Sequence, residues 1–137
     1  AAMGATFGAP ERPIILFTGD GGLQMNIQEL GTIMQSNIPV KVVLLNNNYL
    51  GNVRQWQELF FNHRYSWTPM LNPEYSLIAQ GYGIPSRLVI ERCEHDDAIR
   101  EMLSTDGPFL LHVAVKEEDN VMPMTEPGAT VSEMRFE

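Results

Sequence analysis

Two short apolar runs, each followed by a polar loop, constrain the fold of this chain more than any other feature. The first run covers residues 13–17 and leads into a Gly-Asp-Gly-Gly turn at residues 19–22. The second covers residues 40–45 and leads into three consecutive asparagines at residues 46–48. Runs that are apolar without alternation are typical of strands buried on both faces of a parallel sheet. We therefore expect both runs to be buried strands of an α/β protein.

The segment between the two runs is predicted to be helical. Apolar residues recur at helical spacing over residues 23–34, and Asn37 and Pro39 are expected to end the helix. Strand, helix and strand in this order form a βαβ unit, whose parallel strands end at the same edge of the sheet. α/β proteins bind ligands at that edge. We therefore expect Asp20 and Asn47 to meet there around a metal ion and a phosphate.

The rest of the chain continues the alternation of helices and strands. The pattern predicts helices over residues 50–61, 73–80 and 95–104, and strands over residues 87–90 and 109–115. We therefore expect an α/β domain with a doubly wound, mostly parallel sheet and helices on both faces. This domain should occupy residues 1–115, and residues 116–137 should form a C-terminal tail without clear elements. The small apolar residues at the start look like the end of a close-packed helix, so we expect a piece of a longer protein.

Composition argues against several classes of protein. Of the 137 residues, 44% are hydrophobic, which argues against disorder. The net charge of −8 argues against a nucleic acid or an anionic membrane as the main partner. No apolar run reaches the roughly 18 residues of a membrane helix, and no signal peptide is recognisable. The single cysteine, Cys93, cannot form an internal disulfide. We therefore expect a cytoplasmic protein.

The three histidines do not indicate a metal site. His112 lies in the last predicted strand and is interpreted as a structural residue. His63 and His95 lie in segments that resemble surface loops, and no spacing of histidine and cysteine suggests zinc.

The chemistry of the Gly-Asp-Gly-Gly turn depends on what Asp20 binds. The flanking glycines allow the backbone to approach a ligand closely, and the N-terminus of the following helix favours a phosphate. A lone carboxylate would repel that phosphate, whereas a divalent cation between the two removes the conflict. Mg²⁺ prefers oxygen ligands, and Asp20, the amide of Asn47 and the backbone carbonyl of Tyr49 provide three.

A simpler interpretation stays open at this point. In it, Asp20 only caps the helix after the strand, and the asparagines only support a turn, because asparagine tolerates left-handed conformations. The glycine pattern does not match the phosphate loop, which ends in Gly-Lys-Ser/Thr. It does not match the dinucleotide fingerprint either, because Gln24 stands where the third glycine belongs.

The spacing of the two polar loops supports a family resemblance. Asn47 follows Asp20 by 27 residues, and Gly-Asp-Gly followed by Asn-Asn at this distance resembles the thiamin-diphosphate motif of that enzyme superfamily. The strings at residues 24–30 and 50–57, and the tail at residues 121–129, resemble the catalytic large subunit of acetolactate synthase (acetohydroxyacid synthase). The resemblance covers essentially the whole chain and implies the thiamin-diphosphate-binding fold of that family's C-terminal domain.

The resemblance assigns roles to residues of both loops. It implies that Mg²⁺ is bound by the side chains of Asp20 and Asn47 and by the carbonyl of Tyr49, and that Trp56 lines the substrate channel. The family usually has methionine where this chain has Asn52, so the local shape and polarity there depart from the pattern. The cofactor-binding residues implied are Gly19, Asp20, Gly21, Gly22, Asn47, Tyr49, Leu50, Gly51 and Asn52.

The resemblance also implies an activity. Enzymes of this family decarboxylate pyruvate and join the two-carbon unit to a second 2-keto acid, giving acetolactate or acetohydroxybutyrate for branched-chain amino acid biosynthesis. They form homo-oligomers with sites between subunits, carry FAD mostly on a domain that this chain lacks, and can have a regulatory small subunit. Their activating glutamate belongs to the N-terminal domain of the partner subunit, and nothing in this sequence matches its context. We therefore expect the isolated chain to be inactive.

Two other interpretations remain open. The chain can belong to another thiamin-diphosphate enzyme, such as a pyruvate oxidase or a 2-keto acid decarboxylase. It can also be a non-enzymatic α/β binding module in which Asp20 serves as a helix cap. The string at residues 54–57 favours acetolactate synthase over another thiamin-diphosphate enzyme.

Overall fold

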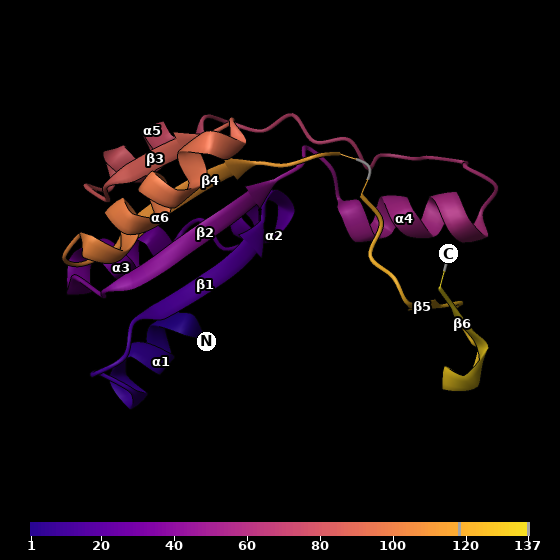
Figure 1. Ribbon diagram of the computed structural model, residues 1–137, viewed down its shortest axis with the longest axis horizontal. Coiled ribbons are helices and arrows are strands. Elements are labelled where there is room, and N and C mark those ends of the chain that lie inside the picture. Colours follow the sequence, from indigo (N-terminus) through magenta and orange to yellow (C-terminus); the bar gives the residue numbers. More distant parts are fainter. Residues whose placement is uncertain (118, 137) are drawn as a thin grey trace.

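The core of the computed structural model is a four-stranded parallel sheet (Figure 1). The structure describes residues 1–117 and 119–136. In the register of neighbouring strands, Gly19 pairs with Leu45 and Asn46 with Ala114, so the carboxyl ends of three strands meet at one edge. The expected parallel α/β sheet is confirmed. Its order is β1-β2-β4-β3, with β1 at Ile14–Gly19, β2 at Val40–Asn46, β3 at Ser86–Val89 and β4 at Phe109–Ala114.

Helices cover both faces of the sheet, as expected (Figure 1). On β2, alternate residues serve the two faces, because successive side chains of a strand point to opposite sides. Val42 and Leu44 belong to one core and Val43 belongs to the other. The first core packs against α1 (Ala2–Gly8), α3 (Glu29–Ser36) and α5 (Tyr75–Gly81), and the second against α6 (His95–Ser104), which follows the 3₁₀ turn η1 (Arg92–Glu94).

Strand β1 has a different environment from the one expected. It lies at the edge of the sheet, and Ile15 and Phe17 remain 40% and 67% exposed. Both side chains line a groove with Val43 and residues of α6, so they belong to the second core's face. The prediction of a strand buried on both faces is therefore right for β2 and wrong for β1. An apolar run indicates a strand but does not reveal whether a neighbour will cover each side.

The single helix expected over residues 23–34 is wrong, because the structure contains two helices there. Helix α2 (Asp20–Gln24) starts directly after β1, and α3 begins only at Glu29. The break follows from Asn26, whose Nδ2 donates to the carbonyl of Gly22 at 3.0 Å. An asparagine side chain that bonds a backbone carbonyl competes with the helical ladder. Hydrophobic periodicity continues across the break and therefore conceals it.

Two further expectations are corrected. Helix α5 begins at Tyr75 and not at Pro73, because the side chain of Glu74 caps it by accepting from the backbone N–H of Ser76 at 3.2 Å.

The tail, expected to be irregular, contains three short elements. These are β5 (Met124–Thr125), the 3₁₀ turn η2 (Val131–Glu133) and β6 (Met134–Arg135), with β5 and β6 antiparallel.

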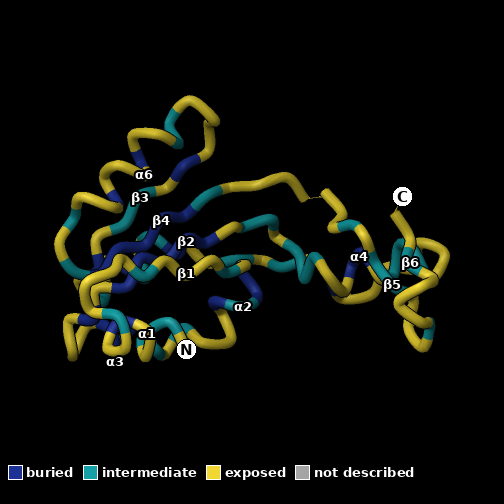
Figure 2. The backbone as a smooth tube through the Cα atoms, turned by 60° about the horizontal axis from the view of Figure 1, so that its bottom comes forward, coloured by how far each residue is buried: buried dark blue, intermediate teal, exposed yellow. Residues whose placement is uncertain are grey.

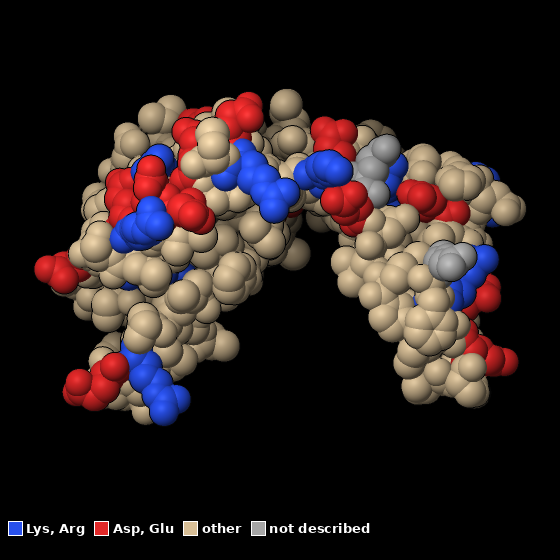
Figure 3. Space-filling view, viewed as in Figure 1, with Lys and Arg blue, Asp and Glu red and all other residues tan. Residues whose placement is uncertain are grey.

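Helix α4 (Gly51–Phe60) and the C-terminal elements lie apart from the sheet (Figure 1). Gln55 joins them through two hydrogen bonds with the backbone of Val121, and Arg135 Nη1 donates to the carbonyl of Leu59 at 3.0 Å. Buried residues concentrate in the sheet and its helices (Figure 2). The space-filling view has an arched outline, with charged side chains mainly on its outer side (Figure 3). Within the described ranges, no helix is both long and apolar enough to cross a membrane.

Candidate functional site

A pocket of about 550 Å³ opens where β1 and β2 end. All nine residues that the sequence singled out as cofactor-binding line it. The pocket also takes in the start of α4 and three residues of the C-terminal segment, Lys116, Asp119 and Val121. The sheet edge, α4 and the C-terminal segment therefore enclose one concave site, as expected for an α/β protein that binds a ligand at the carboxyl ends of its strands.

Asp20 is the buried charge of this pocket, with only 1% of its surface exposed. Its Oδ1 accepts from the backbone N–H of Gly21 at 3.0 Å, and its Oδ2 accepts from Asn72 Nδ2 at 2.6 Å. The N-cap position of α2 belongs to Gly19, so Asp20 is the first helical residue and not the cap. The helix-cap interpretation of Asp20 is therefore wrong in its stated form.

At Gly21 and Gly22 of the pocket, an added Cβ would force a neighbouring side chain to shift. A Cβ at Gly21 would lie 2.7 Å from Cδ2 of Leu50. A Cβ at Gly22 would lie 2.9 Å from Oγ1 of Thr18. The backbone can therefore approach a ligand at these positions without an intervening side chain. The N–H of Gly21, which the resemblance assigns to the diphosphate, already donates to Asp20.

The loop after β2 is held in shape by its own asparagine side chains. Oδ1 of Asn46 accepts from the N–H of Asn48 at 3.1 Å, and Oδ1 of Asn47 accepts from the N–H of Tyr49 at 3.2 Å. Asn48 has a φ of 58°, in the left-handed region that asparagine tolerates. A short antiparallel bridge joins Tyr49 to Pro69 and fixes the loop from outside.

Arg54 secures the same loop against α4. Its guanidinium lies 5.1 Å from the ring centroid of Tyr49 and 4.8 Å from that of Tyr65. Nη1 of Arg54 also pairs with Oε2 of Glu58 at 3.1 Å, and Arg54 is only 8% exposed. A guanidinium between two aromatic faces is attracted by both ring quadrupoles. Tyr49, the carbonyl ligand implied by the resemblance, is thereby held in place through its side chain.

The residues at this pocket fit a magnesium ion better than a transition metal. Within residues 1–117 and 119–136, no three His, Cys, Asp or Glu side chains cluster in a way that could hold a metal. The pocket offers the Asp20 carboxylate, the Asn47 amide and the carbonyl of Tyr49, and Asp119 also lines it. One or two carboxylates with neutral oxygens suit Mg²⁺, which takes its remaining ligands from phosphate and water. The close glycine backbone leaves room for such a phosphate beside the ion.

Trp56 lies outside this pocket. It lines a neighbouring hollow on α4 together with Gln57 and Phe61, and it is 39% exposed. Asn52 lines both spaces and therefore stands where they adjoin. The structure thus places the predicted channel residue next to the predicted cofactor site but not within it.

Sequence reasoning missed Asn72, whose side chain contacts both Asp20 and the asparagine loop. Nδ2 of Asn72 lies within hydrogen-bond distance of Asp20, Asn46 and Asn48, and its Oδ1 accepts from the hydroxyl of Tyr75. It comes from a loop 52 residues after Asp20. No local pattern marks it, because its partners are assembled only by the fold.

His112 is buried beneath the site, in agreement with a structural role. It is 5% exposed, its Nε2 lies 3.0 Å from Nδ2 of Asn46, and the ring of Tyr75 stacks edge-on against it. Burial lowers the pKa of His112, and the nearby carboxylates of Glu74 and Asp20 oppose this effect. With the Asn46 amide nitrogen facing Nε2, the tautomer that carries its proton on Nδ1 fits this contact.

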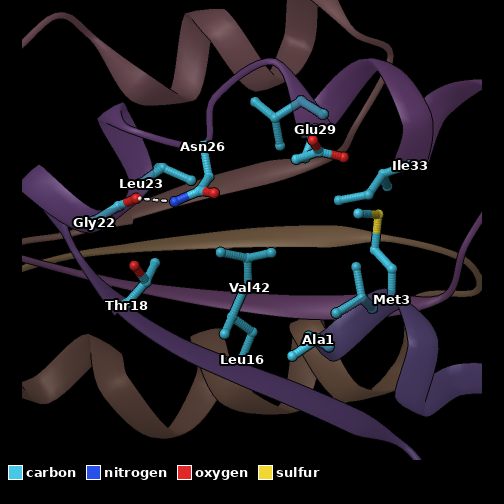
Figure 4. A pocket seen from close by; sticks show the side chains of 13 residues that line it. Ala1, Met3, Leu16, Thr18, Gly22, Leu23, Asn26, Glu29, Ile33 and Val42 are labelled. Carbon is cyan, nitrogen blue, oxygen red and sulfur yellow. Dashed lines mark hydrogen bonds between the residues drawn. The ribbon is translucent and has the colours of Figure 1, made fainter.

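A second cavity, of about 260 Å³, lies between α1, β1 and the α2–α3 region (Figure 4). Its walls are mainly aliphatic, with Leu16, Ile33 and Val42 among them, and Glu29 is the one carboxylate among the lining residues. Gly22 borders both cavities.

The fold and the pocket define an α/β domain with a ligand-sized pocket at the carboxyl edge of its sheet. Residues 1–113 match the family described as "Thiamine pyrophosphate enzyme, C-terminal TPP binding domain", and the chain belongs to this family. Thiamine pyrophosphate is another name for thiamin diphosphate.

Individual relatives and a solved structure show which members of this family the chain is similar to. The chain is 44% identical over 135 residues to "Acetolactate synthase isozyme 2 large subunit" of Escherichia coli (strain K12), which covers 98% of this chain and 25% of that protein. It is 40% identical over 133 residues to "Acetolactate synthase catalytic subunit, mitochondrial" of Saccharomyces cerevisiae, covering 97% and 19%. A thiamine diphosphate-dependent 4-hydroxybenzoylformate decarboxylase of Rhodococcus jostii RHA1 matches with a TM-score of 0.80 and 26% identity, covering 87% and 23%. The chain therefore spans about a quarter of the length of these relatives.

Proposed function

We propose that this chain is the cofactor-binding domain of an acetolactate synthase, a carboligase that joins a two-carbon unit from pyruvate to a second 2-keto acid. The observation that carries the proposal is the pocket at the strand ends, which gathers all nine residues implied by the resemblance. The names of relatives at 38% to 44% identity support the choice among thiamin-diphosphate enzymes.

In this proposal, residues of the two loops bind Mg²⁺ and the diphosphate. Asp20 and Asn47 contribute side-chain oxygens, Tyr49 contributes its carbonyl, and the glycine backbone accommodates the phosphates. Leu50, Gly51 and Asn52 lie along the cofactor, and Trp56 borders the substrate channel. Thiamin diphosphate, when bound, supplies the nucleophilic carbon and the electron sink needed to decarboxylate a 2-keto acid. The chain's own contribution is to hold the metal and to orient the cofactor.

The wider assembly forms part of the same proposal. The chain acts within a longer polypeptide that also carries FAD, and homo-oligomers of it complete each site with the activating glutamate of a partner subunit. A regulatory small subunit is a further partner. We place the enzyme in the cytoplasm, although the yeast relative is named as mitochondrial.

Calorimetric titration of the full-length protein with thiamin diphosphate, with and without Mg²⁺, tests the cofactor site. Asp20→Ala should abolish the Mg²⁺-dependent part of binding because it removes the one buried carboxylate of the pocket. Asp96→Ala, which removes an exposed carboxylate on α6, is the matched control and should bind as the wild type does. Metal-independent binding, or none, by the wild-type protein would favour the non-enzymatic binding module.

A 2-keto acid decarboxylase is the second candidate, supported by the decarboxylase among the solved structures. The two enzymes differ in the fate of the two-carbon unit, which a decarboxylase releases as an aldehyde. Product analysis after incubation of the full-length enzyme with pyruvate therefore decides between them. Acetolactate supports the synthase, whereas acetaldehyde as the main product supports the decarboxylase.

A further inference from the structure

One side chain, Asn72, connects the two halves of the candidate site. Its Nδ2 lies 2.6 Å from Oδ2 of Asp20, at the end of β1. The same nitrogen lies 2.9 Å from Oδ1 of Asn46 and 3.2 Å from Oδ1 of Asn48, in the loop after β2. One amide group thus holds the carboxylate of one strand end and the loop of the next.

The orientation of the Asn72 amide follows from its surroundings. A rotation of the amide by 180° would place its oxygen against three oxygens, whereas its nitrogen finds three acceptors there. Oδ1 of Asn46 is fixed as an acceptor because it also accepts from the N–H of Asn48. On the other side of the amide, the hydroxyl of Tyr75 donates to Oδ1 of Asn72 at 3.0 Å. The amide has two N–H groups for these three acceptors, so the two nearest, on Asp20 and Asn46, are its main partners.

Tyr75 provides a rigid support for this orientation. It is 1% exposed, and its ring packs edge-on against His112 with a centroid distance of 5.6 Å. Its hydroxyl also lies 3.3 Å from the backbone carbonyl of Asp20. The network from Tyr75 through Asn72 to Asp20 is thus anchored in the core.

We propose that Asn72 is a positioning residue of the metal site and that Tyr75 orients it. Asn72 occupies one lone pair of Asp20 Oδ2 and the Gly21 N–H occupies one of Oδ1, so each oxygen keeps a second lone pair for the ion. Hydrogen bonds of this kind fix the direction of a carboxylate and raise the affinity for the metal. The role rests on the proposed function, in which Asp20 binds Mg²⁺.

Mn²⁺ binding to the full-length protein, in the presence of thiamin diphosphate, tests this role. Titration followed by electron paramagnetic resonance gives both the affinity and, at saturation, a spectrum that depends on ligand geometry. Asn72→Ala should weaken Mn²⁺ binding about ten- to a hundredfold and alter the spectrum. Tyr75→Phe, which removes one hydroxyl, should have a smaller effect in the same direction. Tyr82→Phe, the same change at the far end of α5, should match the wild type.

Two controls separate this role from its alternatives. Melting temperatures without metal detect a purely structural effect, so a lower melting temperature with unchanged affinity and spectrum in Asn72→Ala would overturn the proposal. If Asn72→Ala does not fold, Tyr75→Phe decides, and wild-type affinity and spectrum for that variant would overturn it equally. Asp20→Ala with wild-type Mn²⁺ binding would instead refute the proposed function itself.

Discussion

At the scale of single residues, the proposed metal site depends on Asp20, whose side chain is almost completely buried. Two hydrogen bonds, from the Gly21 N–H and from Asn72, replace part of that hydration. A buried carboxylate gains further from a cation, because its charge is poorly compensated by neutral donors alone. Asp20 is thus suited to bind a metal ion and less suited to a surface role.

Gly51→Ala should weaken Mg²⁺-dependent binding of thiamin diphosphate while leaving the fold intact. The added Cβ would lie 2.9 Å from Nδ2 of Asn47, so the amide proposed as a metal ligand must shift. The amide is the free end of a side chain and can move at little cost in stability. Calorimetry should show a loss of affinity of roughly tenfold. Gly81→Ala, where the Cβ meets nothing within 4 Å, is the control, and an equal loss there would contradict the prediction.

His112 should make the stability of the chain depend on pH. Because burial lowers its pKa in the fold, the unfolded chain binds a proton at a higher pH than the folded chain does. The free energy of unfolding should therefore fall as the pH decreases from about 6.5, the ordinary histidine value, towards the lowered pKa of His112. Denaturant titrations between pH 8 and pH 5 should show this slope. His112→Gln should flatten it and the exposed His63→Gln should keep it; equal slopes in both variants would argue against His112 as the cause.

At the scale of elements, α4 holds two neighbouring segments through two glutamines. The side-chain amide of each glutamine exchanges a pair of hydrogen bonds with the backbone of one residue, as a neighbouring strand would. Gln55 exchanges two hydrogen bonds with Val121, at 2.7 and 3.0 Å, and so holds the C-terminal segment. Gln57 exchanges two with Ser66, at 3.1 and 2.9 Å, and so holds the loop after α4. Both segments are irregular, and in each one a glutamine of α4 satisfies one backbone donor and one backbone acceptor.

These two glutamines allow a matched test of how the C-terminal segment is held. Gln55→Ala should increase amide hydrogen exchange at residues 119–123, whereas Gln57→Ala should increase it only near Ser66. The reason is that each change removes the partner of one backbone donor and one backbone acceptor. Exchange measured by mass spectrometry on the full-length protein distinguishes the two regions. Increased exchange in both regions for both variants would mean that α4 itself has loosened.

At the scale of the whole molecule, α4 and the C-terminal elements lie apart from the sheet (Figure 1). Residues of the sheet edge, of α4 and of the C-terminal segment line the pocket. Each part contributes to its walls, so the site depends on how the two are joined. The chain covers only about a quarter of its relatives, and the activating glutamate that the resemblance implies has no counterpart here. In the proposed function, the chain accordingly provides the metal and diphosphate part of a larger site.

The isolated chain should therefore produce no acetolactate from pyruvate, even with thiamin diphosphate and Mg²⁺ added. The physical reason is that it lacks the acid–base group that the proposed reaction requires. A colorimetric assay for acetolactate is sufficient, with the full-length enzyme as the positive control. Clear turnover by the isolated chain would show that all reacting groups lie within these 137 residues.

The sequence by itself determined what depends on neighbouring residues. Continuous apolar runs indicated the strands, and the glycine turn with the asparagine loop indicated which strand ends carry the chemistry. The parallel arrangement then brought Asp20 and Asn47 to one edge, because parallel strands end on the same side. Local patterns were less informative for Asn26, whose side chain interrupts a helix that periodicity alone makes continuous.

Only the tertiary structure decided the environment of each element and the supports of the site. It placed β1 at an exposed edge and β2 at the centre, although their sequences are similarly apolar. It also brought Asn72 against Asp20 across 52 residues of chain. Such contacts depend on loop paths and on the packing of distant elements, for which a single sequence carries no periodic signal.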